Sequence, residues 1–413
     1  MPIRPAGSTR RRAQARTRAV PARMATAILV TGLILPYFTQ AAASDSLPFT
    51  SGEIDRILAH GPWPQPAQRD PSNRVSGNPE AVSLGAVLFF SPRLSGNGRF
   101  LCASCHEPWR AYSDGRDRGL GIEPLERNTP TVLNVRLNRW FGWDGANDNL
   151  WAQSIRPLLD AREMASSARQ IAVLIRGDRE LSSRYAAAFG AEPPANDEAV
   201  LVDVGKALAA YQETLSSERT PFDDFRDALV RRDVVAPTRY PIGAQRGLKI
   251  FIGRGRCDAC HLGPNFTDGE FHRTGSFSTR GNAESELGRQ VGIRKLLASP
   301  HSLLGPYNDD PSRAGAARTS AVSAELGMAG AFRTPSLRNA SLTAPYMHDG
   351  SLATLCEVVQ RHPVRVPSGG TPAVASIPES LSTAERQDLV AFLQTLVPVS
   401  GRAFAVDAST ACP

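Results

Sequence analysis

This sequence contains two copies of a five-residue motif whose side chains could bind a metal or a cofactor. Both read Cys-x-x-Cys-His, at residues 102–106 and 257–261. In c-type haem attachment, two thiols at this spacing add to the haem vinyl groups and the following imidazole binds the iron. The candidate attachment residues are Cys102, Cys105, His106, Cys257, Cys260 and His261. A four-cysteine zinc site is the competing interpretation, but it leaves both histidines without a role. The sequence therefore predicts two covalently attached c-type haems.

The first 43 residues have the pattern of a secretory signal. Seven arginines and no acidic residue precede residue 24, an apolar run spans 24–38, and three alanines follow at 41–43. A basic region, an apolar region and small residues at the cleavage site define such signals, and the apolar run is short for a membrane span. We therefore expect residues 1–43 to be removed on export to the periplasm, with no stable membrane anchor.

The positive charge of the sequence belongs to this leader. The whole chain has a formal net charge of +7, and the leader alone contains seven arginines. The remaining chain is therefore close to neutral, so its charge gives no indication of nucleic-acid binding.

The chain after the leader is long enough for two domains, one around each motif. We expect an N-terminal haem domain at 44–236 and a C-terminal haem domain at 237–413. Residues 44–78 are expected to be an extended lead-in, and residues 274–330 to be irregular. Apolar periodicity predicts helices and no extensive sheet, so the expected fold class is all-α with long irregular loops. The predicted helices are 81–90, 165–176, 198–214, 221–232, 243–251, 354–361 and 382–396.

Two cysteines, Cys356 and Cys412, remain outside the haem motifs. Spare cysteines tend to pair in an oxidising compartment, although sequence alone leaves their distance open. We expect a disulfide that ties the C-terminal tail to the helix at 354–361.

With these motifs in hand, the sequence resembles the bacterial dihaem cytochrome c peroxidase family, nearest its MauG-like branch typified by MbnH. Beyond the haem motifs, the resemblance rests on residues 127–131 (RNTPT), 143–145 (WDG), 334–339 (TPSLRN) and 344–350 (APYMHDG). It implies two cytochrome c-like domains, each with a haem, and a calcium ion between them. It also implies that peroxide reacts at the N-terminal haem while the C-terminal haem handles electrons.

The resemblance gives roles to three residues near the N-terminal haem. Gln153 and Glu163 follow Trp143 by ten and twenty residues, which matches the distal glutamine and glutamate of the family. A carboxylate can take a proton from one peroxide oxygen and return it to the other, so Glu163 is the expected acid/base. Trp143 is expected between the haems as an electron relay. Without the resemblance, a solvated Glu163 and a core Trp143 would be the simpler interpretations.

The sixth ligands of the two irons are expected to differ. Residues 107–127 contain no histidine, whereas many peroxidases of the family carry one there, so the iron bound to His106 is expected to have an open position. Tyr112 is an alternative ligand with nothing in the sequence to favour it. At the C-terminal haem the family's ligand position, methionine in peroxidases and tyrosine in MauG, is occupied by His362. Met347 is the alternative ligand there.

The calcium site implied by the resemblance consists of Asn128 and the carbonyl groups of Thr343 and Pro345. Oxygen ligands suit calcium, and three of them would leave most of the coordination shell to water. The alternative is an ordinary asparagine turn.

Three functions are compatible with these features. The first is a MauG-like enzyme, in which hydrogen peroxide oxidises both haems to a high-valent state that then oxidises a residue of a partner protein. The second is a peroxidase that reduces hydrogen peroxide to water with electrons from a small donor protein. The third, an electron carrier, is disfavoured because a carrier needs no acid/base beside an open iron. The missing histidine and the absence of methionine at position 362 favour the first.

Overall fold

The computed structural model describes residues 47–233, 239–273, 285–323, 328–362, 381–404 and 412. The predicted leader and the predicted domain boundary at residue 236 lie outside these ranges, so both stay predictions. The described residues form twelve α-helices, several short 3₁₀ turns and one two-stranded antiparallel ribbon. The helices are α1 (Ser51–Leu58), α2 (Pro79–Phe89), α3 (Leu150–Leu159), α4 (Ala168–Gly177), α5 (Arg179–Phe189), α6 (Asp197–Gln212), α7 (Pro221–Arg231), α8 (Ile242–Ile252), α9 (Arg289–Ala298), α10 (Ala316–Ser320), α11 (Leu355–Arg361) and α12 (Thr383–Gln394). The predicted all-α class is confirmed.

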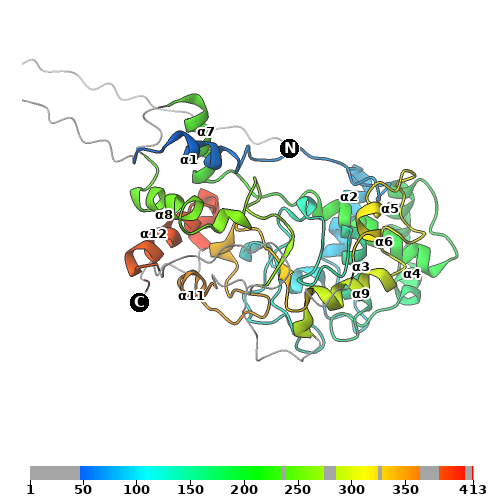
Figure 1. The fold of residues 1–413 in the computed structure, drawn as a ribbon. Helices are drawn as coiled ribbons and strands as arrows, with labels where there is room; N and C mark the ends of the chain where they lie inside the picture. The colour runs from blue at the N-terminus through cyan, green and yellow to red at the C-terminus, as the bar shows by residue number, and fades with distance from the viewer. Residues whose placement is uncertain are drawn as a thin grey trace, which may run out of the picture. The chain divides into compact units, whose positions relative to one another are not determined.

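The helices gather in two groups, which Figure 1 shows on opposite sides of the folded structure. In the first group α6 is central, because α2, α3 and α4 all pack against it. The fully buried Leu84, Trp151 and Val204 belong to the hydrophobic core of this group. Gly205 allows α3 to approach closely, since a Cβ there would lie 2.9 Å from the Trp151 carbonyl.

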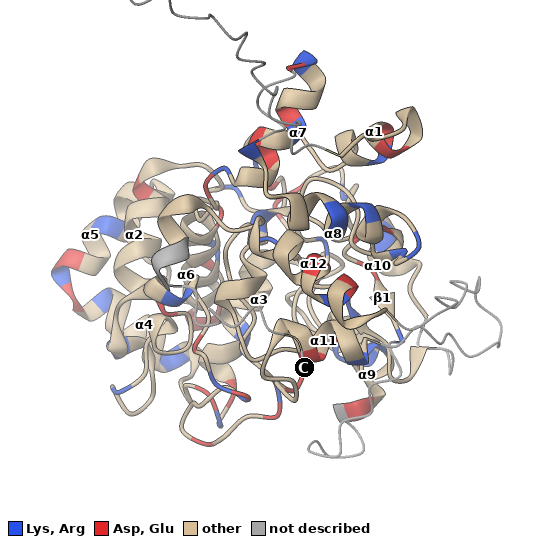
Figure 2. Cartoon of the chain, turned by 90° about the vertical axis from the view of Figure 1, so that its left-hand side faces the viewer, with Lys and Arg blue, Asp and Glu red and all other residues tan. Residues whose placement is uncertain are grey.

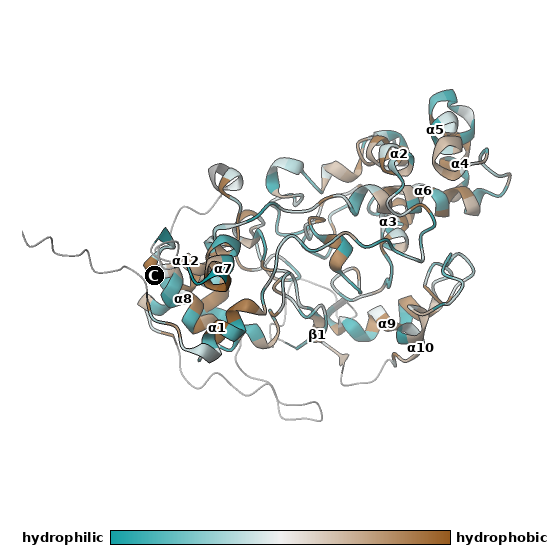
Figure 3. Ribbon diagram, turned by 90° about the horizontal axis from the view of Figure 1, so that it is seen from above, coloured by the Kyte–Doolittle hydropathy of each residue, from teal (hydrophilic) through white to brown (hydrophobic). Residues whose placement is uncertain are grey.

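The second group is built on the packing of α8 against α12. Its core contains a cluster of buried aromatic rings, in which Phe222, Phe251 and Phe392 each contact Phe266. Figure 3 shows hydrophobic and hydrophilic residues on the same helices, as expected for helices that bury one face. On the side of the chain that Figure 2 shows, acidic and basic residues are interspersed along the helices.

All seven helices predicted from periodicity are present, each within a few residues of its expected bounds. The predicted capping box of the last helix is confirmed, because the Ser382 hydroxyl accepts from the Glu385 backbone and the Glu385 carboxylate accepts from the Ser382 backbone. Two expectations were wrong. The lead-in contains α1, which begins at a second capping box between Thr50 and Glu53. The expected irregular stretch 274–330 contains α9 and α10.

The segment that carries α9 and α10 follows the second haem motif in sequence but packs against the first helix group. Figures 1 and 3 place α9 on the same side of the folded structure as α3 and α4. Asp148 accepts from the Leu303 backbone at 3.0 Å and from the Thr319 hydroxyl at 2.6 Å. The buried ammonium of Lys206 pairs with Asp309 at 2.6 Å. Polar contacts therefore join the two halves of the sequence.

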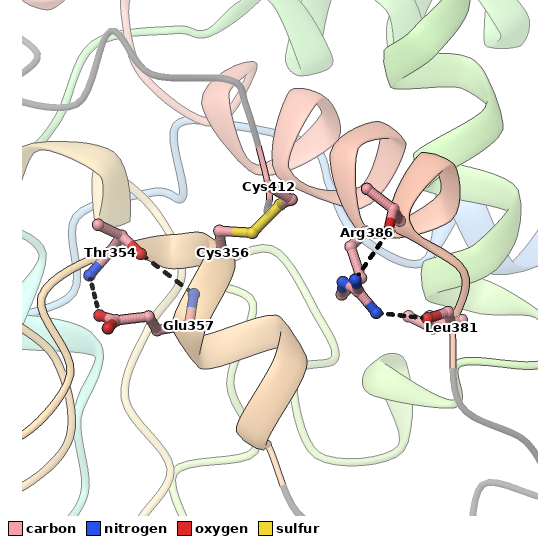
Figure 4. The surroundings of a disulfide bond; sticks show 7 residues. Thr354, Cys356, Glu357, Leu381, Arg386 and Cys412 are labelled. Carbon is pink, nitrogen blue, oxygen red and sulfur yellow. Dashed lines mark hydrogen bonds between the residues drawn. A yellow bond between two sulfur atoms is a disulfide. The ribbon is translucent and has the colours of Figure 1, made fainter.

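The expected disulfide between Cys356 and Cys412 is confirmed, with the two Cα atoms 5.4 Å apart. Figure 4 shows that it joins the first turn of α11 to the end of the chain, beside α12. Thr354 caps the same helix, because its hydroxyl accepts from the Glu357 backbone at 3.1 Å. The helix that precedes His362 is thus fixed at its start by a cap and a covalent bond. Within the described residues no helix is long and apolar enough to cross a membrane.

Candidate dihaem site

Both haem motifs have the same local structure. Each follows a helix, α2 or α8, and its first cysteine begins a 3₁₀ turn, η2 (Cys102–Ser104) or η6 (Cys257–Ala259), which the second cysteine ends as its C-cap. In the first motif the histidine ring nitrogen Nδ1 of His106 lies 3.1 Å from the carbonyl oxygen of Tyr112. In the second, Nδ1 of His261 lies 3.1 Å from the carbonyl oxygen of Phe266. A carbonyl partner fixes the proton on Nδ1 and leaves Nε2 to bind a metal, so both motifs fit a haem iron.

The cysteines do not form a zinc site. Such a site needs all four thiolates around one ion. The described residues contain one group of candidate metal-binding side chains, Cys260, Asp268 and His272, within 4.8 Å of one another. This group has a single cysteine, and that cysteine belongs to the second haem motif. The four-cysteine alternative is therefore wrong.

Glu163 lies beside the first haem motif rather than in open solvent. Its side chain is 16% exposed and pairs with Arg156 at 2.7 Å. The turn that carries it is organised by Asp160, whose carbonyl oxygen accepts from the Glu163 backbone at 3.1 Å. The charge of Glu163 raises the pKa of Cys105, after the larger effects of burial and of Asp114. The carboxylate is therefore within electrostatic reach of the motif.

A glycine permits the close approach of this turn. A Cβ on Gly121 would lie 2.5 Å from the Glu163 Cα, so only glycine fits without movement. The Ile122 backbone N–H donates to the Glu163 carbonyl oxygen at 3.1 Å. Leu120, one residue before this glycine, offers its carbonyl oxygen to the Cys105 thiol at 3.7 Å. The loop after the first haem motif thus connects that motif to Glu163.

Gln153 and Trp143 lie on the adjoining segment. The Gln153 side-chain oxygen accepts from Asn147 at 2.9 Å. The Trp143 indole N–H donates to the Asn128 carbonyl oxygen at 2.8 Å, and its own carbonyl oxygen accepts from the Arg333 backbone at 2.9 Å. Trp143 is therefore held between residues from the two halves of the sequence.

The rings of His261 and His362 lie close to one another, with their centroids 6.4 Å apart and their planes inclined at 66°. Two imidazoles on opposite sides of one metal ion have centroids roughly 6.3 Å apart, given metal–nitrogen bonds of about 2.0 Å. Burial, followed by the nearby His362, lowers the pKa of His261 to about 4, so its ring is neutral at neutral pH, as ligation requires. Met347 lies in a tight turn with left-handed backbone, φ 73°.

The other histidines are occupied by protein partners. His60 lies 3.2 Å from the Gly263 carbonyl oxygen, and the remaining three each contact a carboxylate. Those contacts are His272 with Asp268 at 2.6 Å, His301 with Glu198 at 2.6 Å, and His348 with Glu286 at 3.2 Å. Tyr112 is also engaged, since its side chain bonds to Tyr211. None of the five is placed as a further ligand.

Asn128, a residue of the expected calcium site, contacts the stretch 344–350. Its backbone N–H donates to the His348 carbonyl oxygen at 3.0 Å, which brings it beside the stretch that contains Thr343 and Pro345. Its side-chain amide donates to the Arg116 carbonyl oxygen at 2.9 Å. Asparagine and carbonyl oxygens suit calcium.

Sequence reasoning missed two residues of the site, Arg156 and Arg333. Arg156 lies one helical turn before the end of α3 and pairs with Glu163 seven residues later. Arg333 lies in the ribbon strand β2 (Phe332–Arg333), which pairs with β1 (Phe271–His272), and its Nε–H donates to the Gly142 carbonyl oxygen at 3.2 Å. Seven-residue spacing was a usable signal for the first, but nothing local marks the second.

Comparison with known proteins agrees with this geometry. The family model described as di-haem cytochrome c peroxidase matches residues 79–229. The methylamine utilization protein MauG of Methylorubrum extorquens is 34% identical over 91% of this chain and 95% of its own length. The cytochrome-c peroxidase IdrP2 of Pseudomonas sp. (strain SCT) is 34% identical over 78% of this chain and 82% of its own length.

Solved structures give the same fold. A MauG-like protein associated with microbial copper homeostasis matches 85% of this chain and 98% of its own, at a TM-score of 0.58 and 27% identity. The diheme peroxidase BthA from Burkholderia thailandensis matches 84% of this chain and 90% of its own, at a TM-score of 0.63 and 21% identity. This chain belongs to the dihaem cytochrome c peroxidase and MauG family of oxidoreductase enzymes. The family implies two c-type haems, which the two motifs fit.

Proposed function

We propose that this protein is a periplasmic, MauG-like enzyme that uses hydrogen peroxide to oxidise a residue of a partner protein. The observation that carries the proposal is the pair His261 and His362, whose 6.4 Å spacing suits two imidazole ligands on one iron. Imidazole donates more strongly than a thioether and so favours the higher oxidation states of iron. The bound haems would supply the redox chemistry.

The chain's own groups handle the proton at the peroxide site. His106 is the candidate ligand on one side of the N-terminal iron, and no other histidine lies in the first half of the chain after it. His106 would hold the N-terminal haem, and the bound haem would supply the site at which peroxide reacts. Glu163 accepts the proton of one peroxide oxygen and returns it to the leaving oxygen, while Arg156 holds its carboxylate in place. Gln153 is proposed to orient the peroxide.

The proposed function also includes electron transfer between the haems, a calcium ion and export from the cytoplasm. Trp143 relays electrons between two haem domains, at 44–236 and 237–413. Asn128 with the carbonyl groups of Thr343 and Pro345 binds a calcium ion between them. The basic and apolar leader, residues 1–43, directs export to the periplasm.

An ordinary peroxidase, which reduces peroxide to water with electrons from a small donor protein, is the second candidate. What favours it is the similarity to relatives named cytochrome-c peroxidase, at the same 34% identity as MauG.

The two candidates differ in the resting protein and in what peroxide oxidises. For the MauG-like function, paramagnetic resonance of the fully oxidised protein should show one high-spin haem and one low-spin bis-histidine haem. Peroxide should react at once, and a partner protein mixed in should gain an oxidative mass change. A methionine-to-iron absorption band, or no reaction until one haem is reduced, would instead identify an ordinary peroxidase.

A further inference from the structure

Arg333 carries a buried guanidinium that faces no anionic group among the described residues. It is 8% exposed, and its Nε–H donates to the Gly142 carbonyl oxygen at 3.2 Å. Burial, with no opposing charge, lowers its pKa to about 10. Within the described part of the chain, no ion pair and no aromatic face joins its guanidinium.

The other deeply buried arginines are compensated. Arg338 pairs with Asp223 at 2.8 Å. Arg289 lies 4.0 Å from the ring of Phe271 and donates to the Gly145 carbonyl oxygen at 2.6 Å. A buried charge without a partner is strongly unfavourable, so the position of Arg333 calls for an anion.

The location of Arg333 identifies the anion. Its backbone N–H donates to the Trp143 carbonyl oxygen at 2.9 Å, and its strand is fixed by pairing with Phe271. The next residue, Thr334, accepts a hydrogen bond at its carbonyl oxygen from the Thr267 hydroxyl at 2.7 Å, in the loop that follows His261, the proposed ligand of the C-terminal iron. Arg333 therefore lies between Trp143 and this iron ligand.

We propose that the Arg333 guanidinium binds a carboxylate, a propionate of the haem held by His261. This rests on the proposed second haem. A guanidinium matches a carboxylate with two parallel N–H donors, and the haem brings its own carboxylates into the site. The same residue then fixes the haem through its side chain and Trp143 through its backbone. A displacement of the haem would therefore also shift Trp143, the proposed electron relay.

The test measures the reduction potential of each haem against pH in the dihaem protein, by spectroelectrochemical titration. Arg333→Met removes the positive charge and leaves a propionate unpaired. The potential of the C-terminal haem should fall, and it should become pH-dependent as the unpaired propionate takes up a proton. The N-terminal haem should keep its potential. Arg333→Lys keeps the charge and should lie close to the unmutated protein.

Arg289→Met is the matched control. It removes another buried guanidinium beside the same loop, but one whose partners are aromatic rings and backbone carbonyl groups. Its C-terminal haem should show no new pH dependence. A pH dependence equal to that of Arg333→Met would overturn the proposal, because it would reflect the loop and not a paired carboxylate.

Formate added to the unmutated protein separates the two possible sources of the carboxylate. If a propionate fills the site, formate has no effect on the potential of the C-terminal haem. A formate-dependent potential of that haem shows that a free anion binds instead and overturns the proposal. It is also overturned if Arg333→Met retains two haems with both potentials unchanged. Mass spectrometry showing one haem in the unmutated protein would refute the second haem itself.

Discussion

The carboxylate of Glu163 and the guanidinium of Arg156 form an ion pair of 2.7 Å across the end of α3. The pair holds Glu163 on the inner side of its turn, with 16% of its side chain exposed. A free surface glutamate would have no fixed orientation, and proton transfer to peroxide depends on geometry before pKa. The arrangement suits a fixed acid/base better than a solubilising charge.

Replacing Glu163 with glutamine should slow peroxide cleavage by about 10²–10⁴-fold, because an amide cannot shuttle the proton. The spectra of both haems should stay nearly unchanged. Stopped-flow mixing with peroxide measures the rate. Glu180→Gln, on the largely exposed face of α5, is the control and should react at the normal rate. An unaltered rate in Glu163→Gln would assign Glu163 to the surface.

Gly121→Ala should slow the same reaction although the carboxylate of Glu163 is chemically unchanged. The new Cβ would meet the Glu163 Cα at 2.5 Å and push the turn away from the haem motif. Overpacking of this kind costs about 1–3 kcal/mol, so the melting temperature should also fall. Gly177→Ala has nothing within 4 Å and serves as the control. Equal peroxide rates in the two variants would show that this loop does not position Glu163.

His362→Met should keep the C-terminal haem low-spin and raise its reduction potential, because methionine favours the reduced iron. The fully oxidised state reached with peroxide should become shorter-lived. Spectroelectrochemistry gives the potential, and a new near-infrared methionine band gives the ligand. If that band is already present in the unmutated protein, then Met347 and not His362 binds the iron.

Removing the disulfide with Cys356→Ser and Cys412→Ser together should lower the stability of the C-terminal helix group. In the chain-entropy model, a bridge across 56 residues contributes about 4 kcal/mol. The helix α11 leads directly to His362, so its loosening should also convert part of the C-terminal haem to high spin. Thermal unfolding and paramagnetic resonance report the two effects. Unchanged values for both would mean that the tail adds nothing to this site.

Arg338→Met should be strongly destabilising, because it leaves Asp223 charged and unpaired in the core. The two side chains are 0% and 1% exposed, and losing one member of such a pair costs about 3–5 kcal/mol. Arg246→Met removes an exposed partner of Asp388 and should cost about 0–1 kcal/mol. Thermal melts of both variants compare the two pairs, and similar melting temperatures would contradict the assigned roles.

Local signals made much of the fold predictable. The helices α2, α8 and α12 combine apolar periodicity with caps or turns nearby, and these signals need no tertiary information. The helix α3 was missed because Pro157 lies inside it. The helix α9 was missed because it buries Arg289 and Gly292, residues that weaken the apolar pattern.

The site divides in the same way. Haem attachment depends on a motif of five consecutive residues, so it could be predicted directly from the sequence. The relation of His261 to His362 spans about a hundred residues and could be expected only from the family resemblance. Arg333 could not be predicted at all, since its neighbours Gly142 and Trp143 are brought to it by the fold.

The contacts of Asp148 and Lys206 limit how the polypeptide can be divided. Both buried side chains receive their partners from residues 303–319, beyond the second haem motif. If the chain were cut near residue 236, the N-terminal fragment would keep the Asp148 carboxylate and the Lys206 ammonium group but lose these partners. The N-terminal haem region is therefore not an independent folding unit. Transferring it to another protein, or expressing it separately, requires residues 303–319 as well.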